Sequence, residues 1–338
     1  MTAVTERIAR LNPFARGGAE PAVVPAPDRM ADPDGPLFDE ELLGRLRRVA
    51  LVSSHSIAEG LAGEHRSKRR GSSPEFADFK IYSQGDDFRR IDWNLYARLD
   101  DVFVRLSEVT TELTVHVLLD ASDSMDWRGD EGRPSKFRYA RQVAGSLCYV
   151  SLWHFDRVIV APFGEDLAPA FGPAQGRAHV MPMLSFLSRQ GTLGATDLPT
   201  AIERYVRARR RPGLMVVVSD LLSGEPEQLQ ERLRDLRARG WQTIVVHVVD
   251  DAELDPSDVA GGGGRPQPTD LIDLESGERL RIVPGADVLA RYGAAVAAWL
   301  AEIEEVCAAE RADYVRLSTS WPFHTVVLNL LNRRGLLA

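Results

Sequence analysis

The chain has 338 residues, 44% of them hydrophobic, and its formal net charge at pH 7 is −8. This negative balance argues against nucleic-acid binding by the whole molecule. No apolar run approaches the roughly 20 residues that cross a bilayer, and the N-terminus lacks the apolar core of a signal peptide. Cys148 and Cys307 stand among apolar neighbours in helical patterns, which is typical of reduced, buried thiols. We therefore expect a cytoplasmic protein that does not insert into membranes.

The N-terminal third is expected to be an extension of the main domain. Residues 1–36 are rich in Pro, Ala, Gly and Asp without a regular period, which predicts a disordered tail. The extension proper covers residues 37–110, and leucines at helical spacing predict a helix from Asp39 to near Gly60. The basic run at 66–70 is either a solvated loop or a contact for an acidic partner or for phosphate.

A denser block, EFADFKIYSQGDDFRRIDWNLYAR, occupies residues 75–98. Its first part predicts an extended segment, and a further strand is expected at 102–106. The packing residues expected in the extended segment are Phe76, Phe79, Ile81 and Tyr82. The mixture of Asp and Arg around Trp93 allows two interpretations, a structural network of ion pairs or a docking surface.

Residues 111–320 alternate strand and helix patterns. Strands are expected at 115–119, 156–163, 167–171 (an edge strand, given Pro169), 214–218, 243–249 and 313–317. Helices are expected from Ser135, at 179–187, after the loop at 191–198, around 226–239 and at 285–311, with a hairpin at 271–282 and a final helix within 321–338. This alternation predicts an α/β fold, a doubly wound, mainly parallel sheet with helices on both faces.

Oxygen-bearing side chains follow two of the apolar strands. Asp120, Ser122 and Ser124 come directly after 115–119, Asp220 follows 214–218, and Thr196 lies in a glycine-bearing loop that enters a helix. In such sheets, ligands bind beyond the carboxyl ends of the strands, at the point where the strand order reverses. If the strands 115–119 and 214–218 are neighbours across this reversal, the carboxylates of Asp120 and Asp220 meet at one point. This all-oxygen set suits Mg²⁺, with Mn²⁺ as a substitute. The alternatives are that Thr196 is a plain N-cap and Asp220 a plain strand-end acid.

Three motifs in this order, DASDSM, ATDL and VVVSD, resemble the von Willebrand factor A domain and its metal-ion-dependent adhesion site. The preceding block, GSSPEFADFKIYSQGDDFRRIDWNLYAR, resembles the hallmark segment of a bacterial branch catalogued as domain of unknown function fifty-eight. The combined resemblance covers roughly residues 40–320.

The resemblance implies that Ser122, Ser124 and Thr196 bind the ion directly, and that Asp120 and Asp220 bind it directly or through water. An acidic side chain of a protein partner would fill the remaining position. The resemblance also implies a partner, a MoxR-type AAA+ ATPase or its client, and hence a non-enzymatic adaptor for assembly or maturation of complexes.

One residue departs from the pattern, and two other functions remain open. Asp123 is an extra acid that either weakens the capture of an acidic partner or faces solvent. A magnesium-dependent phosphohydrolase would also place an acid after a central strand, but it usually needs a second acid where this chain has Ser122. The third possibility is a scaffold whose metal site has no function. No phosphate-binding Gly-x-x-x-x-Gly-Lys-Ser/Thr motif is present, so ATP chemistry by that route is excluded.

Overall fold

The structure is a computed structural model, and it describes residues 35–48, 76–82, 91, 93, 96, 101–107, 113–209, 211–256, 268–272, 274–275 and 279–321. Apart from Gly35, Pro36 and Trp321, the predicted tail, the basic run and the final helix lie outside these residues. The chain divides into two compact units, one comprising Met1–Ile57 with Leu113–Ala338, and the other Ala58–Glu112.

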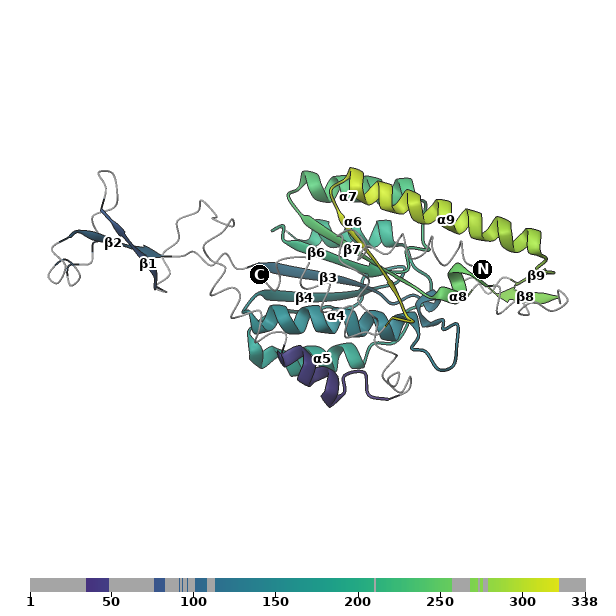
Figure 1. Ribbon diagram of the computed structural model, residues 1–338, viewed down its shortest axis with the longest axis horizontal. Coiled ribbons are helices and arrows are strands. Elements are labelled where there is room, and N and C mark those ends of the chain that lie inside the picture. Colours follow the sequence, from purple (N-terminus) through teal and green to yellow (C-terminus); the bar gives the residue numbers. More distant parts are fainter. Residues whose placement is uncertain are drawn as a thin grey trace, which may run out of the picture. The chain divides into compact units, whose positions relative to one another are not determined.

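The larger unit is built on a six-stranded sheet with the order β10-β7-β6-β3-β4-β5 (Figure 1). Its strands are β3 Thr114–Asp120, β4 Arg157–Phe163, β5 Phe171–Gln175, β6 Leu214–Ser219, β7 Gln242–Val249 and β10 Asp313–Ser318. All neighbours pair in parallel except β4 and β5, which are antiparallel at one edge. The expected doubly wound, mainly parallel α/β sheet is confirmed.

The predicted edge strand at 167–171 is displaced towards the C-terminus. Leu167 makes a single bridge with Phe163, and the strand itself begins only at Phe171. Pro169, between these two points, has no N–H to donate to a ladder, so continuous pairing begins after it.

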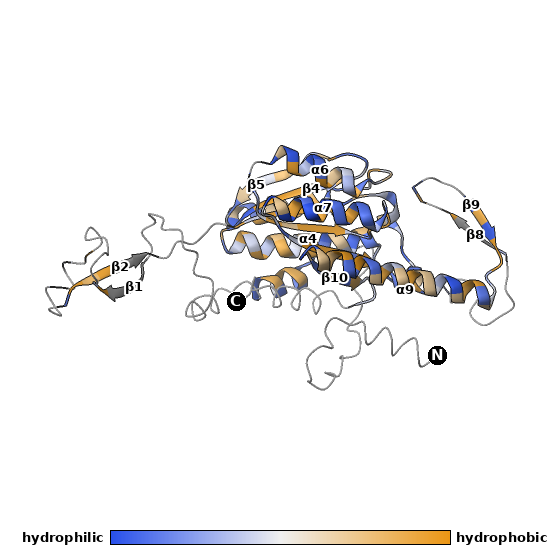
Figure 2. Cartoon of the chain, turned by 90° about the horizontal axis from the view of Figure 1, so that it is seen from above, coloured by the Kyte–Doolittle hydropathy of each residue, from blue (hydrophilic) through white to orange (hydrophobic). Residues whose placement is uncertain are grey.

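Helices cover both faces of the sheet (Figure 1). They are α4 Lys136–Trp153, α5 Val180–Ser188, α6 Leu198–Ala208, α7 Pro226–Ala238, the one-turn α8 Asp251–Leu254 and α9 Ala286–Ala309, with short 3₁₀ turns η2 Asp123–Asp126 and η3 Arg177–His179. Successive residues of a strand point to opposite faces, so Val117 and Leu119 of β3 pack with α4 and α5, whereas Leu118 packs with α6, α7 and α9. The strands are coloured mostly hydrophobic, whereas the helices carry both hydrophilic and hydrophobic residues (Figure 2).

The described part of the predicted N-terminal helix, residues 40–48, packs on the α4 side of the sheet. Asp39 caps it, because its Oδ1 accepts a hydrogen bond from the Leu42 backbone N–H at 2.7 Å. Leu42 and Leu46 are buried in the same core as α4. This helix therefore belongs with the sheet.

The smaller unit contains an antiparallel pair, β1 Phe76–Ile81 and β2 Phe103–Ser107. The prediction of two extended segments is confirmed here. The packing role expected for Ile81 and Tyr82 is wrong, because both side chains are exposed. Trp93 is also exposed and meets the Tyr96 ring edge-on at 6.3 Å.

The predicted hairpin is confirmed as β8 Thr269–Ile272 paired with β9 Arg279–Ile282. Cys148 and Cys307 are both free and buried, and burial raises the pKa of each thiol to about 12. Within the described ranges, no helix combines the length and the apolar character needed to span a bilayer.

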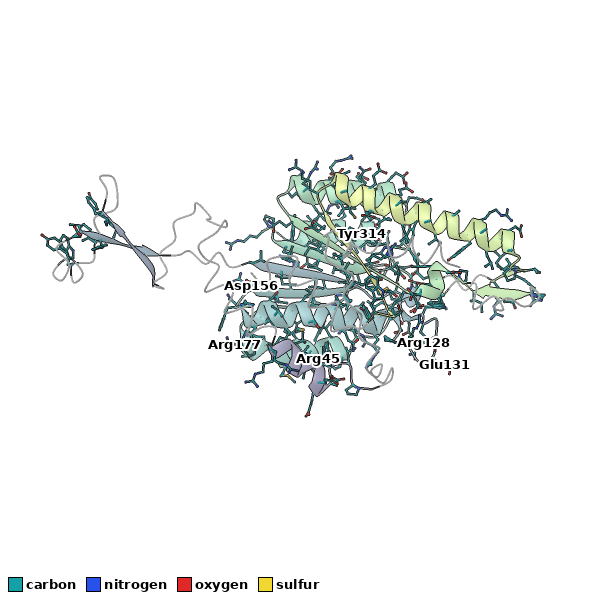
Figure 3. All side chains as sticks on the ribbon, viewed as in Figure 1. Arg45, Arg128, Glu131, Asp156, Arg177 and Tyr314 are labelled. Atoms are coloured by element: carbon teal, nitrogen blue, oxygen red, sulfur yellow. The ribbon has the colours of Figure 1, made fainter. Side chains whose placement is uncertain are left out.

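The parallel strands give the sheet two different ends. Their carboxyl ends lead into η2, α8 and the loops that carry the predicted ligands, and Arg128 and Glu131 lie at this end (Figure 3). Asp156 precedes β4 and lies at the opposite end (Figure 3). All the predicted ligands therefore belong to the carboxyl end.

Candidate metal site

The strand order reverses between β3 and β6. From β3 the chain passes through α4 to β4 on one side, and from β6 it passes through α7 to β7 on the other. The two strands are neighbours, with Leu119 opposite Val218. Asp120 is the last residue of β3 and Asp220 directly follows β6, so both carboxylates stand at the reversal, as the sequence predicts for adjacent strands.

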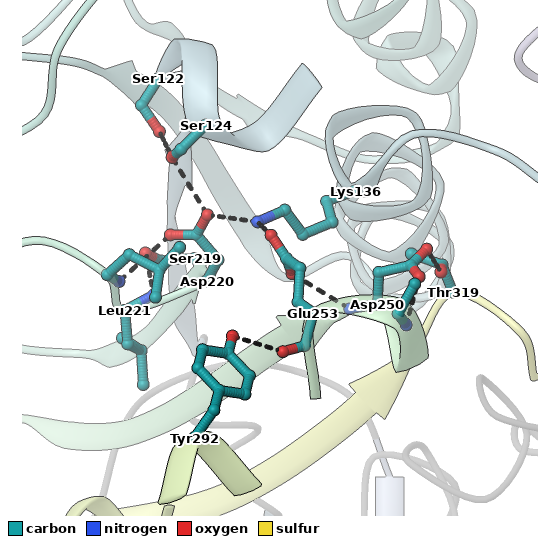
Figure 4. A network of polar contacts seen from close by, with 12 residues as sticks. Ser122, Ser124, Lys136, Ser219, Asp220, Leu221, Asp250, Glu253, Tyr292 and Thr319 are labelled. Carbon is teal, nitrogen blue, oxygen red and sulfur yellow. Dashed lines mark hydrogen bonds and ion pairs between the residues drawn. The ribbon is translucent and has the colours of Figure 1, made fainter. Parts of the chain in front are cut away.

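Hydroxyl and carboxylate oxygens form a continuous row at this point (Figure 4). Ser122 Oγ lies 3.0 Å from Ser124 Oγ, and Ser124 Oγ donates a hydrogen bond to Asp220 Oδ2 at 3.0 Å. The Asp120 carboxylate is fixed beside this row by two donors, Ser219 Oγ at 2.5 Å and the Ser122 backbone N–H at 3.0 Å. These hydrogen bonds bring together four of the five predicted ligands.

Thr196 is not the N-cap of α6. Asp197 takes that role, because its side chain accepts a hydrogen bond from the Thr200 backbone N–H at 3.0 Å. The Thr196 Oγ1 atom is buried and has no hydrogen-bond partner within the described part of the chain. A buried hydroxyl without a partner is costly, so this atom is available for a ligand that the protein itself does not supply.

Backbone hydrogen bonds hold the Thr196 loop against the Ser122–Ser124 turn. Leu193 N–H donates to the Ala121 carbonyl at 2.6 Å, and Asp123 N–H donates to the Gly194 carbonyl at 2.8 Å. The Asp123 carboxylate in turn accepts the Gly194 N–H at 3.3 Å. Asp123 thus joins two ligand-bearing loops. The sequence-based interpretations, that Asp123 weakens the capture of an acidic partner or faces solvent, did not include this role.

Burial shapes the electrostatics of the site. Asp120 has no exposed surface, and this desolvation, followed by the charge of Asp220, raises the pKa of Asp120 to about 7 against the opposing hydrogen bond from Ser219. Two buried carboxylates so close together are stabilised by a cation.

One such cation is built into the protein. Lys136 is fully buried, and its Nζ lies 2.8 Å from Asp220 Oδ2 and 2.5 Å from Glu253 Oε1 (Figure 4). Burial by itself would lower the pKa of Lys136, but the two carboxylates outweigh it and raise this pKa above its usual value. For Glu253 burial has the opposite sign and raises the pKa of the carboxyl group, while the positive charge of Lys136 opposes this shift.

Three further residues of the site, Lys136, Ser219 and Glu253, were not predicted from the sequence. Lys136 is the first residue of α4, where a cation opposes the helix dipole, and that unfavourable placement was the available signal. Ser219 ends an apolar strand and Glu253 lies on a single-turn helix, and neither position stands out in the sequence.

The residues present are compatible with Mg²⁺. Two carboxylates and three hydroxyls form an oxygen-only donor set, which hard cations prefer. When Asp120, Asp220 and Glu253 are all ionised, they exceed the single charge of Lys136 by two negative charges, which a divalent ion would balance. No group of three or more His, Cys, Asp or Glu side chains suited to a metal occurs over the described ranges, so the candidate site depends on its hydroxyls.

Two further features mark this end of the sheet. Leu221, directly after Asp220, adopts a left-handed backbone with φ of 56°, which is unfavourable for a bulky residue. The Ser219 hydroxyl holds it there by accepting the Leu221 N–H at 2.9 Å. Leu222 and Leu193, on the Asp220 and Thr196 loops, are 56% and 44% exposed, so both ligand-bearing loops present apolar side chains to solvent.

The fold and this oxygen cluster define an α/β protein with a candidate cation site at the reversal of a doubly wound sheet. The family model described as "Protein of unknown function DUF58" matches residues 78–298. The chain belongs to this family.

The chain is also similar to two mycobacterial proteins and to several solved structures. Uncharacterized protein Rv1480 of Mycobacterium tuberculosis (strain ATCC 25618 / H37Rv) and uncharacterized protein Mb1516 of Mycobacterium bovis are each 29% identical over 325 residues, which cover 94% of this chain and 97% of theirs. The conserved hypothetical protein BatB from Bacteroides thetaiotaomicron is 17% identical with a TM-score of 0.40, covering 65% of this chain and 98% of its own. Manganese-loaded TRAP protein from Plasmodium vivax is 13% identical with a TM-score of 0.29, covering 40% of this chain and 56% of its own.

Proposed function

We propose that the protein is a metal-dependent protein-binding module. Ser122, Ser124 and Thr196 would hold Mg²⁺, or Mn²⁺ in its place, together with Asp120 and Asp220, either directly or through water. The observation that carries the proposal is the buried, unpartnered hydroxyl of Thr196 on a loop hydrogen-bonded to the turn that contains the Ser122–Ser124 pair.

The side chains suit capture of a carboxylate better than chemistry on a substrate. When bound, the ion would supply a positive centre with a coordination position left for an incoming oxygen ligand. The serine and threonine hydroxyls carry no charge, so they leave that centre attractive to an acid from outside. Leu193 and Leu222 would add apolar contact around such a ligand, as the core of a protein interface requires.

The proposed partner is a protein that offers an acidic side chain, a MoxR-type AAA+ ATPase or its client. This part of the proposal rests on the family resemblance. The sequence contains no phosphate-binding motif of the Gly-x-x-x-x-Gly-Lys-Ser/Thr type, so in such a complex the ATPase would supply the energy and this chain would act as an adaptor in assembly or maturation.

Titration calorimetry with Mg²⁺ and Mn²⁺ tests the site. Asp120→Asn keeps the size of the buried side chain and an oxygen that can accept the Ser122 N–H, so the fold should survive while metal binding is lost. Ser122→Ala with Ser124→Ala should have the same effect. Asp126→Asn, an exposed acid on the same 3₁₀ turn, is the matched control and should bind as the wild type does.

A pull-down from the native host tests the partner. Retention of an ATPase by the wild type, and its loss with EDTA or in Asp120→Asn, supports a metal-mediated contact. Retention of the ATPase under all three conditions contradicts that contact. Steady turnover of a phosphate ester that disappears in Asp120→Asn would indicate a phosphohydrolase instead.

The contact of Lys136 with Asp220 favours a second candidate, a scaffold that needs no metal. In that case the ammonium group, at 2.8 Å from Asp220 and 2.5 Å from Glu253, would be the cation that stabilises the acids in place of a metal ion. The scaffold predicts no heat of metal binding in wild type, and melting temperatures that do not change with Mg²⁺ or EDTA.

A further inference from the structure

A side chain from outside the predicted ligand set contacts the Thr196 loop. Glu275 lies between the strands of the β8–β9 hairpin, 79 residues after Thr196 in the chain, and its Oε2 accepts the Thr196 backbone N–H at 3.3 Å. This hairpin lies at the same end of the unit as α8, beyond the carboxyl ends of the strands (Figure 1). The contact brings a carboxylate to the residue whose hydroxyl is buried and unpartnered.

The surroundings of Glu275 differ from those of its neighbours on the hairpin. Ile272 and Leu274 are 51% and 45% exposed, although both are apolar, whereas the charged side chain of Glu275 is only partly exposed. An acid that is less exposed than the apolar residues just before it in the chain reverses the usual arrangement. The contact with the Thr196 loop contributes to this partial burial.

We propose that Glu275 is an additional acidic ligand of the candidate metal site, supplied by the chain itself at the position where a partner's carboxylate would bind. The inference rests on the proposed function, because it assigns an occupant to the same coordination position. It follows that a protein partner competes with Glu275 for the ion, and that the apolar side chains of Ile272 and Leu274 become a neighbouring contact surface for the competitor.

The competing explanation is structural. An acid close to the start of α6 interacts favourably with the helix dipole, and Glu275 would then only stabilise the Thr196 loop. The two explanations differ in what happens at the metal. A ligand affects the affinity and the number of water molecules on the ion, whereas an acid at the helix start changes only stability.

The test uses Mn²⁺ as the probe and the full chain. Titration calorimetry gives the Mn²⁺ affinity, and water-proton relaxation gives the number of water molecules bound to Mn²⁺. In Glu275→Gln and Glu275→Ala we expect the Kd to rise roughly tenfold, because one anionic ligand is lost, and one more water molecule to bind the ion. Glu305→Gln, which removes an exposed carboxylate on α9, is the matched control and should change neither quantity.

The outcomes separate the two proposals. If Mn²⁺ binds to wild type, is lost in the Ser122→Ala/Ser124→Ala variant, and binds to both Glu275 variants with unchanged Kd and hydration, the ligand role of Glu275 is wrong while the metal site stands. If wild type does not bind Mn²⁺, the proposed function itself fails. A second readout is competition by acetate, which should displace water from Mn²⁺ at lower concentration in Glu275→Ala than in wild type.

Discussion

The Nζ atom of Lys136 lies 2.8 Å from Oδ2 of Asp220, and neither side chain is more than 2% exposed. A buried ion pair of this kind links the first turn of α4 to the end of β6, two elements 84 residues apart in the chain. It also places a fixed positive charge next to a proposed metal ligand, so the lysine and a divalent ion would share the same acids.

Replacing Lys136 by Met should expose this competition. The change leaves Asp220 and Glu253 without their buried counter-charge and should lower the free energy of unfolding by about 3 kcal/mol in metal-free buffer. Added Mg²⁺ should restore more stability to Lys136→Met than to wild type, as measured by urea unfolding with and without the ion. Arg281→Met breaks a fully exposed pair with Asp270 and should change little in either buffer. Equal effects of Mg²⁺ on wild type and Lys136→Met would contradict the sharing of acids.

Asp123 should act as a positioning residue for the site. Its carboxylate accepts the Gly194 N–H at 3.3 Å, so Asp123→Ala removes one tie between the Ser124 turn and the Thr196 loop. We expect a loss of about 1 kcal/mol in stability and a roughly tenfold weaker affinity for Mn²⁺ in calorimetry. Asp126→Ala on the same turn should leave the affinity unchanged. A Mn²⁺ affinity that is higher in Asp123→Ala would show instead that this acid interferes with binding.

The buried histidines should make the protein sensitive to mild acid. His116 is 2% exposed, with its Nδ1 2.8 Å from the Tyr205 hydroxyl, and burial, followed by the charge of Arg209, lowers its pKa from 6.5 to about 4. Between these values the unfolded chain binds a proton that the folded chain does not. The stability that depends on neutral His116 is therefore complete above pH 6.5 and is lost as the pH falls towards 4, by about 3 kcal/mol.

Urea unfolding at several pH values checks this expectation. Between pH 6.5 and 4, the free energy of unfolding should change less steeply with pH in His116→Gln than in wild type. The difference in slope should correspond to about one bound proton. His247, whose pKa burial lowers to about 3, should still contribute its own slope in that variant. His179→Gln changes an exposed histidine and serves as the control. A slope in His116→Gln equal to that of wild type would show that His116 titrates normally in the folded protein.

The attachment of the N-terminal helix to the sheet should depend on Gly145. A Cβ atom at this position of α4 would lie 2.4 Å from Cζ of Phe38, so Gly145→Ala should push Phe38 outward at a cost of about 1–3 kcal/mol. Hydrogen exchange of residues 40–48 should accelerate. Gly293→Ala, on α9 where a Cβ meets nothing within 4 Å, should be neutral or stabilising. Unchanged exchange in Gly145→Ala would show that the helix does not need this contact.

The sequence was informative wherever burial and strand direction decide the outcome. The sequence predicts that Asp120 and Asp220 meet if their strands are neighbours, because each acid follows a largely apolar run and parallel strands bring such ends together. The N-cap of α6 was ambiguous because Thr196 and Asp197 are adjacent and both residue types can cap. The contacts of Lys136 with Glu253 and of Glu275 with Thr196 join positions 117 and 79 residues apart, and no local pattern specifies such pairs.

The candidate ligands lie at one end of the sheet, so the opposite end is convenient for attaching a label. Arg239, in the exposed turn before β7, is separated from the carboxyl end of the sheet by the length of an eight-residue strand, roughly 20 Å or more. The two native thiols, both buried and with a pKa of about 12, should not react with maleimides near neutral pH. Arg239→Cys would therefore accept a single dye or surface tether, oriented so that the Asp120 end remains open to whatever binds there.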